Sequence, residues 1–143
     1  MVMKIFFKDD APEIINNTFY ISGKIEIGDE YQCFKSSLVF WNKEAYLSQW
    51  KKSLKQFVNE DLNSTYLLTD VSNPDYANFF FWWILYKDGA LVRVQEAILF
   101  TSDLNENYDL LDLYEYIPSY ESHTEDGVEI SEWTTSLYNL KTF

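Results

Sequence analysis

The chain has 143 residues, one cysteine and a formal net charge of -12 at pH 7, and 19% of its residues are aromatic. This length predicts one domain over residues 1–143, and the many aromatics with only four glycines and three prolines exclude a disordered chain. A single cysteine excludes an internal disulfide, and the acidic balance disfavours nucleic acid and anionic membranes as partners. Charges near the N-terminus argue against a signal peptide, and Phe79–Tyr86, the longest apolar run, is too short to cross a bilayer, so we expect a cytoplasmic protein.

The negative charge is concentrated in the C-terminal third. The first 93 residues contain twelve acidic and ten basic residues, whereas residues 94–140 contain eleven acidic residues and no lysine or arginine. Like charges repel one another in a compact state, so this concentration needs a reason. Two interpretations are open: a solvated face that keeps the protein dispersed, or a surface that meets a strongly basic partner.

The N-terminal part of the chain is expected to form strands and then a helix. Short strands are predicted over Lys4–Lys8, Thr18–Ile27 and Tyr31–Phe40, and a turn at Gly28-Asp29 joins the last two as a hairpin. Apolar residues then recur every three or four positions over Lys43–Val58, which predicts an amphipathic helix with Asn42 as its N-cap.

The middle of the chain is expected to supply the core of a sheet. A short strand is predicted over Tyr66–Thr69, and a turn at Asn73-Pro74-Asp75 follows. Phe79–Tyr86 is apolar without alternation, which indicates a central strand buried on both faces. Asp88-Gly89 is typical of a type I′ hairpin turn, after which Leu91–Phe100 returns as the partner strand.

The C-terminal part is expected to be acidic and less regular. Asn107–Tyr116 is predicted to be a short helix or turn, and residues 119–127 a polar loop. Ser131 is predicted to cap a last helix, with Glu132 in its first turn and Trp133 in the core. The fold class that follows is α+β: a single domain with a mostly antiparallel central sheet and two or three helices.

Few residues suggest catalysis or metal binding. No phosphate-binding loop, zinc motif or cofactor motif is present, so we expect no cofactor. Cys33 is expected to be a small buried residue of a strand and His123 a passive surface residue, although a small enzyme that uses both remains an alternative. A calcium- or sugar-binding module is another alternative. Residues 103–109 are spaced like the start of a calcium loop, but Tyr108 and Tyr114 replace its glycine and bidentate glutamate.

Three stretches together resemble the immunity proteins of bacterial contact-dependent growth inhibition systems (CdiI-type). They are Phe40-Trp41 followed by Tyr46-x-x-Gln49-Trp50-x-x-x-Leu54, then Phe81-Trp82 through Leu85-Tyr86-x-x-Gly89, and Thr124-Glu-Asp-Gly-Val-Glu-Ile-Ser-Glu-Trp133. The resemblance extends from about Phe40 to the C-terminus. It implies a protein that is not an enzyme and that neutralises one cognate toxin domain by occluding its active site. Such toxins are commonly nucleases, with an EndoU-type RNase as a narrower candidate.

This role agrees with the charge pattern. A nuclease is basic where it holds phosphates, so an acidic inhibitor is attracted to that groove. We therefore expect a basic toxin domain as the partner, bound about one to one through the acidic third. Tyrosines among the acids could be the anchors of the interface. The predicted contact residues are Asp103, Glu106, Tyr108, Asp109, Asp112, Glu115, Tyr116, Tyr120, Glu121, Glu125, Asp126 and Glu129.

Overall fold

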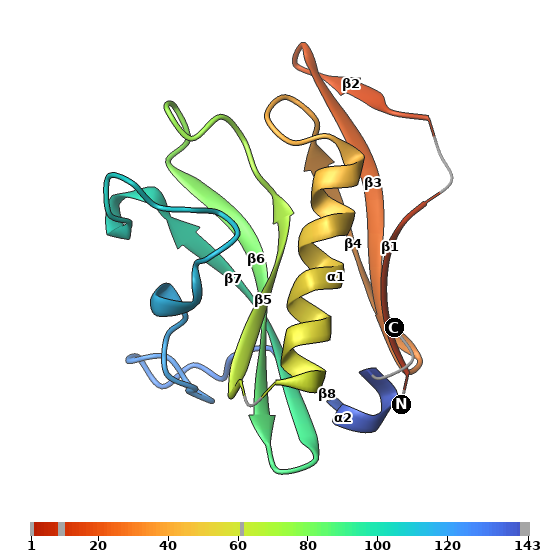
Figure 1. Ribbon diagram of the computed structural model, residues 1–143, viewed down its shortest axis with the longest axis vertical. Coiled ribbons are helices and arrows are strands. Elements are labelled where there is room, and N and C mark those ends of the chain that lie inside the picture. The colour runs from red at the N-terminus through yellow and green to blue at the C-terminus, as the bar shows by residue number, and fades with distance from the viewer. Residues whose placement is uncertain (1, 9–10, 61, 141–143) are drawn as a thin grey trace.

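The computed structural model describes residues 2–8, 11–60 and 62–140 and shows two antiparallel sheets with one long helix packed against both (Figure 1). The first sheet contains β1 (Met3–Phe7), β2 (Glu13–Ile15), β3 (Thr18–Ile27) and β4 (Glu30–Ser37). Strand β3 is central: β1 and β2 pair with different stretches of one of its edges, and β4 pairs with the other edge.

The second sheet holds the most buried strand. It contains β5 (Ser64–Asp70), β6 (Phe79–Asp88), β7 (Leu91–Phe100) and β8 (Trp133–Ser136), hydrogen-bonded in that order. The helices are α1 (Lys43–Asn59) and the short α2 (Leu137–Leu140), and there are two 3-10 turns, η1 (Thr101–Asp103) and η2 (Tyr114–Tyr116). Five consecutive residues of β6, Trp82–Tyr86, are buried as predicted, whereas Phe79 at the start of the apolar run is exposed.

One glycine allows the first sheet to pack closely against α1. Gly23 pairs with Phe34 across β3 and β4, and a Cβ at Gly23 would overlap the Phe34 ring. The space lets this ring reach Phe7 at 6.2 Å and Trp50 of α1 at 5.8 Å between ring centroids. The absence of a side chain at Gly23 therefore allows the first sheet to pack against the core.

Helix α1 begins where the sequence predicts and hydrogen-bonds to the edge of strand β5. Asn42 caps it by accepting a hydrogen bond from the backbone of Ala45. On its buried face the Gln49 amide accepts from the Leu68 backbone nitrogen at 2.9 Å and donates to the Tyr66 carbonyl at 3.1 Å. The Trp50 indole donates to the Leu68 carbonyl at 2.7 Å. These side chains replace the neighbouring strand that β5 lacks on this side, so its buried backbone groups stay paired.

The two sheets meet at the ends of β4 and β5. The Tyr46 hydroxyl donates to the Ser37 carbonyl at 2.7 Å and accepts from the Val71 backbone nitrogen at 2.9 Å. The Ser37 backbone nitrogen donates to the Asp70 carboxylate at 3.0 Å. One helix residue and one carboxylate thus hold the junction together.

Asp70 supplies a prediction about pH. Burial raises the pKa of this carboxyl, although the hydrogen bond from Ser37 opposes the rise. A raised pKa in the folded state means that the folded protein holds this proton more tightly than the unfolded chain does. The folded state therefore loses stability as the pH rises above about 3.9, the pKa of the carboxyl in the unfolded chain. Asp70→Asn keeps an oxygen acceptor and removes the charge. We expect it to be more stable than the wild type at pH 7, with the difference vanishing near pH 3, in urea denaturation followed at both pH values. Asp29→Asn, at an exposed turn, is the control and should change little. A less stable Asp70→Asn at pH 7 would contradict this.

Most predicted elements are confirmed. The strands over Thr18–Ile27 and Leu91–Phe100 have the predicted bounds, and α1 ends one residue beyond its predicted end. The α+β class is confirmed as well, although the strands form two sheets and not one central sheet. Among the described residues, no helix has the length and apolarity needed to span a membrane.

The predicted last helix is wrong over its first half. Trp133–Ser136 forms strand β8, which pairs with Leu91–Val94 of β7, and only Leu137–Leu140 is helical. The β-branched Thr134 and Thr135 favour a strand, and Trp133 packs on Trp83 across the sheet with ring centroids 5.3 Å apart. The segment expected to be one helix is thus divided between two elements, a strand and a short helix.

Two boundaries in the predicted hairpins also differ. Strand β4 ends at Ser37, three residues before the predicted Phe40. The β6–β7 turn is Gly89-Ala90, because Asp88 still pairs with Leu91. Gly89 has φ +62° but Ala90 has no positive φ, and a type I′ turn needs positive φ at both central residues. The predicted hairpin is therefore confirmed, and the predicted turn type is wrong.

Candidate functional site

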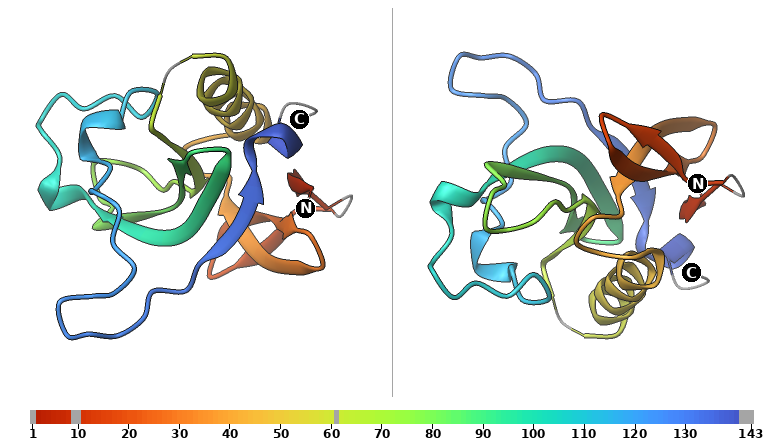
Figure 2. Two further views of the ribbon diagram at one scale, coloured as in Figure 1. Left: turned by 90° about the horizontal axis from the view of Figure 1, so that it is seen from below. Right: turned by 90° about the horizontal axis from the view of Figure 1, so that it is seen from above.

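The acidic segment, residues 103–129, lies on the side of the second sheet that faces away from the first sheet. In Figure 1 it is the cyan-to-blue chain on the left, and both views of Figure 2 place it opposite β1–β4. It contains little regular structure beyond η1 and η2, so its course depends on tertiary contacts. The predicted contact residues therefore share one side of the molecule.

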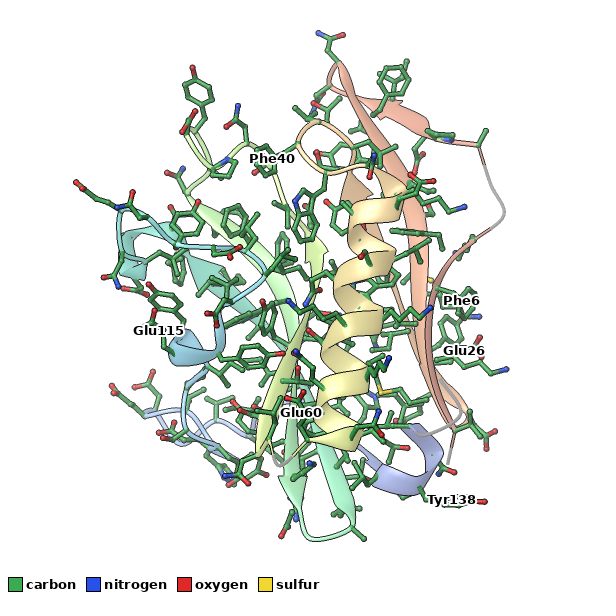
Figure 3. The ribbon with its side chains drawn as sticks, viewed as in Figure 1. Phe6, Glu26, Phe40, Glu60, Glu115 and Tyr138 are labelled. Carbon is green, nitrogen blue, oxygen red and sulfur yellow. The ribbon has the colours of Figure 1, made fainter. Side chains whose placement is uncertain are left out.

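All nine predicted carboxylates of this segment are exposed. Within residues 2–8, 11–60 and 62–140, none of the nine forms an ion pair. Asp109 accepts a hydrogen bond from the Leu111 backbone nitrogen, which shapes the local turn. Figure 3 shows Glu115 pointing outward from this side, whereas Glu26 lies on the opposite side. The side is thus strongly negative, and no lysine or arginine of the described residues neutralises these nine carboxylates.

A buried tyrosine fixes the middle of the acidic segment to the sheet. The Tyr66 hydroxyl donates to the Leu110 carbonyl at 2.7 Å and accepts from the Leu113 backbone nitrogen at 3.3 Å. Burial raises the pKa of the Tyr66 phenol, which keeps it protonated as a donor. The neighbouring Tyr114 hydroxyl donates to Gln56 of α1 at 3.0 Å. These bonds set the positions of Asp109–Glu115.

Two residues of β6 and β7 hold the next part of the segment. The Tyr86 hydroxyl donates to the Pro118 carbonyl at 3.0 Å, and the Gln95 amide donates to the Glu121 carbonyl at 3.0 Å. The Tyr86 ring also packs edge to face on Tyr120, with centroids 5.3 Å apart. The sheet therefore orders a loop that has no regular structure of its own.

Glu132 closes this arrangement, and its predicted place in a helix is wrong. It precedes β8, and its carboxylate accepts from the Tyr120 hydroxyl at 2.6 Å, from Gln95 at 3.0 Å and from the Arg93 guanidinium at 2.9 Å. Arg93 also pairs with Asp88 at 3.0 Å. Burial raises the pKa of Glu132, but these three donors outweigh it and lower the pKa below its ordinary value. The one arginine beside the acidic segment is thus neutralised by two carboxylates.

The three predicted tyrosine anchors differ in their surroundings. Tyr108 is half-buried and packs on Phe80, with ring centroids 6.4 Å apart. Tyr116 is half-buried, and its hydroxyl accepts from the Asn105 backbone nitrogen. Tyr120 is exposed and lies under Arg93. All three help to shape the segment, and Tyr120 presents the most surface to a partner.

The structure gives little support to the alternative enzyme, metal and sugar sites. Cys33 is exposed and not buried as predicted, and its sulfur accepts a hydrogen bond from Lys8. His123 contacts Ser122, so the two residues have different partners. The described part of the chain contains no cluster of three or more potential metal ligands. Trp82 and Trp83 are buried in β6, so they offer no exposed ring on which a sugar could stack.

A cleft of about 650 Å³ opens at one end of the acidic segment. The predicted residues Glu106, Tyr108 and Asp109 line it. Residues that precede α1 and residues of the 73–76 turn also line it. The predicted set omits Phe40 and Asp75, which also line this cleft. These two are far from the acidic segment in sequence, and charge pattern alone gave no signal for them.

Comparison with known proteins identifies the family. The family model of the CdiI N-terminal domain matches residues 36–143. The curated "Immunity protein CdiI" of Enterobacter cloacae subsp. cloacae is 27% identical over 137 residues, which cover 96% of this chain and 93% of that protein. A chain in the solved "CdiA-CT/CdiI toxin and immunity complex from Enterobacter cloacae" superposes with a TM-score of 0.87, at 27% identity, over 99% of this chain and 94% of that chain. This protein therefore belongs to the CdiI N-terminal domain family.

Proposed function

We propose that this protein binds and neutralises the cognate toxin domain of a contact-dependent growth inhibition system, and that the acidic segment is the binding surface. The observation that carries the proposal is the set of nine exposed carboxylates on one side of the second sheet, none of which pairs with a cation of the described residues. The similar solved chain comes from a toxin and immunity complex, which supports a toxin as the partner.

The charge of the surface supports a nuclease as the toxin. A nuclease holds phosphates with basic residues, so a dense negative surface competes for the same groove and speeds association at low salt. A protein bound in that groove occludes the active site. We expect about one molecule of this protein per toxin. An EndoU-type RNase remains the narrower candidate. The proposed role needs no catalysis, cofactor or nucleic acid, and it places the protein in the cytoplasm.

The direct test mixes the protein with the toxin domain encoded beside it and follows cleavage of RNA and of DNA. We expect cleavage by the toxin alone and its loss at about equimolar protein. Binding without loss of cleavage would contradict occlusion of the active site. A toxin that binds but cleaves neither substrate would contradict the nuclease assignment, and absence of binding would contradict the proposed function as a whole.

Neutralising part of the acidic segment should slow complex formation. We expect the triple variant Asp112→Asn/Glu115→Gln/Glu121→Gln to bind the toxin at least about tenfold more slowly at low salt, because steering by surface charge is lost. The measurement is the association rate by stopped flow. The matched control, Glu26→Gln/Asp29→Asn/Glu30→Gln, removes the same number of charges from the first sheet. Equal rates for the two variants would contradict the assigned surface.

A further inference from the structure

A second feature gives the proposed interface a specific pocket. The Phe40 cleft, as we name the 650 Å³ cleft, lies between the residues before α1, the start of α1 itself, the 73–76 turn and residues 106–111. Figure 3 shows Phe40 between the loop that precedes α1 and the connection from β5 to β6. Segments far apart in sequence thus form its walls.

The Phe40 cleft is open to solvent, and part of its wall is apolar. Phe40 is 47% exposed and Leu111 is 44% exposed, although both are large hydrophobic residues. Beside Phe40, the Trp41 ring packs against the buried Tyr46 with centroids 5.3 Å apart, which makes this wall rigid. Exposed apolar side chains around a concave surface are typical of a site that a partner covers.

The same cleft is negatively charged. Three carboxylates line it, those of Asp75, Glu106 and Asp109, and no lysine or arginine is among its described lining residues. Burial raises the pKa of the Tyr108 phenol, and the nearby charge of Asp75 raises it further. The Tyr108 hydroxyl is shielded from solvent and has no hydrogen-bond partner among the described residues.

We propose that the Phe40 cleft receives a lysine or arginine side chain of the cognate toxin. Such a side chain has an apolar stem that fits the walls and a charged head that the three carboxylates attract. An aromatic wall adds attraction for the cation, more so when water is excluded. Arginine is also among the residues that most often anchor the centre of a tight interface. This inference rests on the proposed function and adds a site with a defined occupant to it.

The test uses the toxin domain as the probe and four forms of this protein. Asp75→Asn/Glu106→Gln removes two charges from the cleft without changing shape, and Phe40→Ala removes its exposed aromatic wall. Asp29→Asn/Glu30→Gln is the matched control, which removes the same number of charges from the exposed turn between β3 and β4, outside the acidic segment. Calorimetry gives each affinity, and thermal unfolding checks that each variant is folded. We expect both cleft variants to bind at least about tenfold more weakly than wild type, and the control to change affinity less than about threefold.

The outcomes separate this inference from the proposed function. Wild-type protein that fails to bind the toxin would overturn both. Wild-type binding with unchanged affinity in both cleft variants would overturn the cleft and leave the proposed function standing. Loss in Phe40→Ala alone would indicate an apolar occupant and contradict the cationic one. An equal loss of affinity in the charge variant and in its control would show that the charges act only through general electrostatic attraction. That result would also contradict the inference.

Discussion

Gln49→Leu should lower the free energy of unfolding by about 3 kcal/mol, since buried backbone groups left without a partner cost about 1–3 kcal/mol each. Leucine fills a similar volume but pairs with neither the Leu68 nitrogen nor the Tyr66 carbonyl, both of which Gln49 satisfies. Both backbone groups belong to residues that are fully buried, so water cannot replace the lost bonds. Urea denaturation followed by tryptophan fluorescence measures the loss.

Gln32→Leu is the matched control, because Gln32 is an exposed residue of β4. We expect it to change stability by less than about 0.5 kcal/mol, as surface substitutions usually do. A loss at Gln49 no larger than that of the control would show that α1 does not satisfy the edge of β5.

Tyr66→Phe should cost about 2 kcal/mol of stability, because it leaves the Leu110 carbonyl and the Leu113 nitrogen without their shared partner. It should also weaken binding to the toxin, since these two bonds position the centre of the acidic segment. The pair of measurements is urea denaturation and calorimetry with the toxin domain.

Tyr138→Phe is the control for this change, because Tyr138 is 75% exposed on α2, away from the acidic segment. It should alter neither quantity. Full toxin affinity in a destabilised Tyr66→Phe protein would contradict the view that the segment must be held in place to bind.

Local patterns predicted the elements where one periodicity dominates. The apolar stripe and the Asn42 cap predict the bounds of α1 to within one residue, and the unbroken apolar run predicts the buried strand β6. The pattern Tyr46-x-x-Gln49-Trp50, which carries part of the family resemblance, has a physical role. These side chains form hydrogen bonds with backbone groups of β5 and of the residue that follows it. Strand β8 was missed because its pairing with β7 joins residues about forty positions apart, and no local pattern records such a pairing.

The candidate site was predictable in its charge and not in its shape. The absence of lysine and arginine from residues 94–140 was enough to select the acidic side. The ion pair between Arg93 and Glu132 and the walls of the Phe40 cleft depend on tertiary contacts between distant segments. Sequence spacing contains no information on such contacts, so Glu132 was assigned to a helix and Phe40 to the end of a strand.

The measurement that tests the central claim most directly is calorimetry of this protein with its cognate toxin domain at low and at moderate salt. Binding through exposed carboxylates predicts a tight complex of about one to one that weakens as salt screens the charges. Tight binding of equal strength at both salt concentrations would contradict the acidic segment as the binding surface, and absence of binding at low salt would contradict the toxin as the partner.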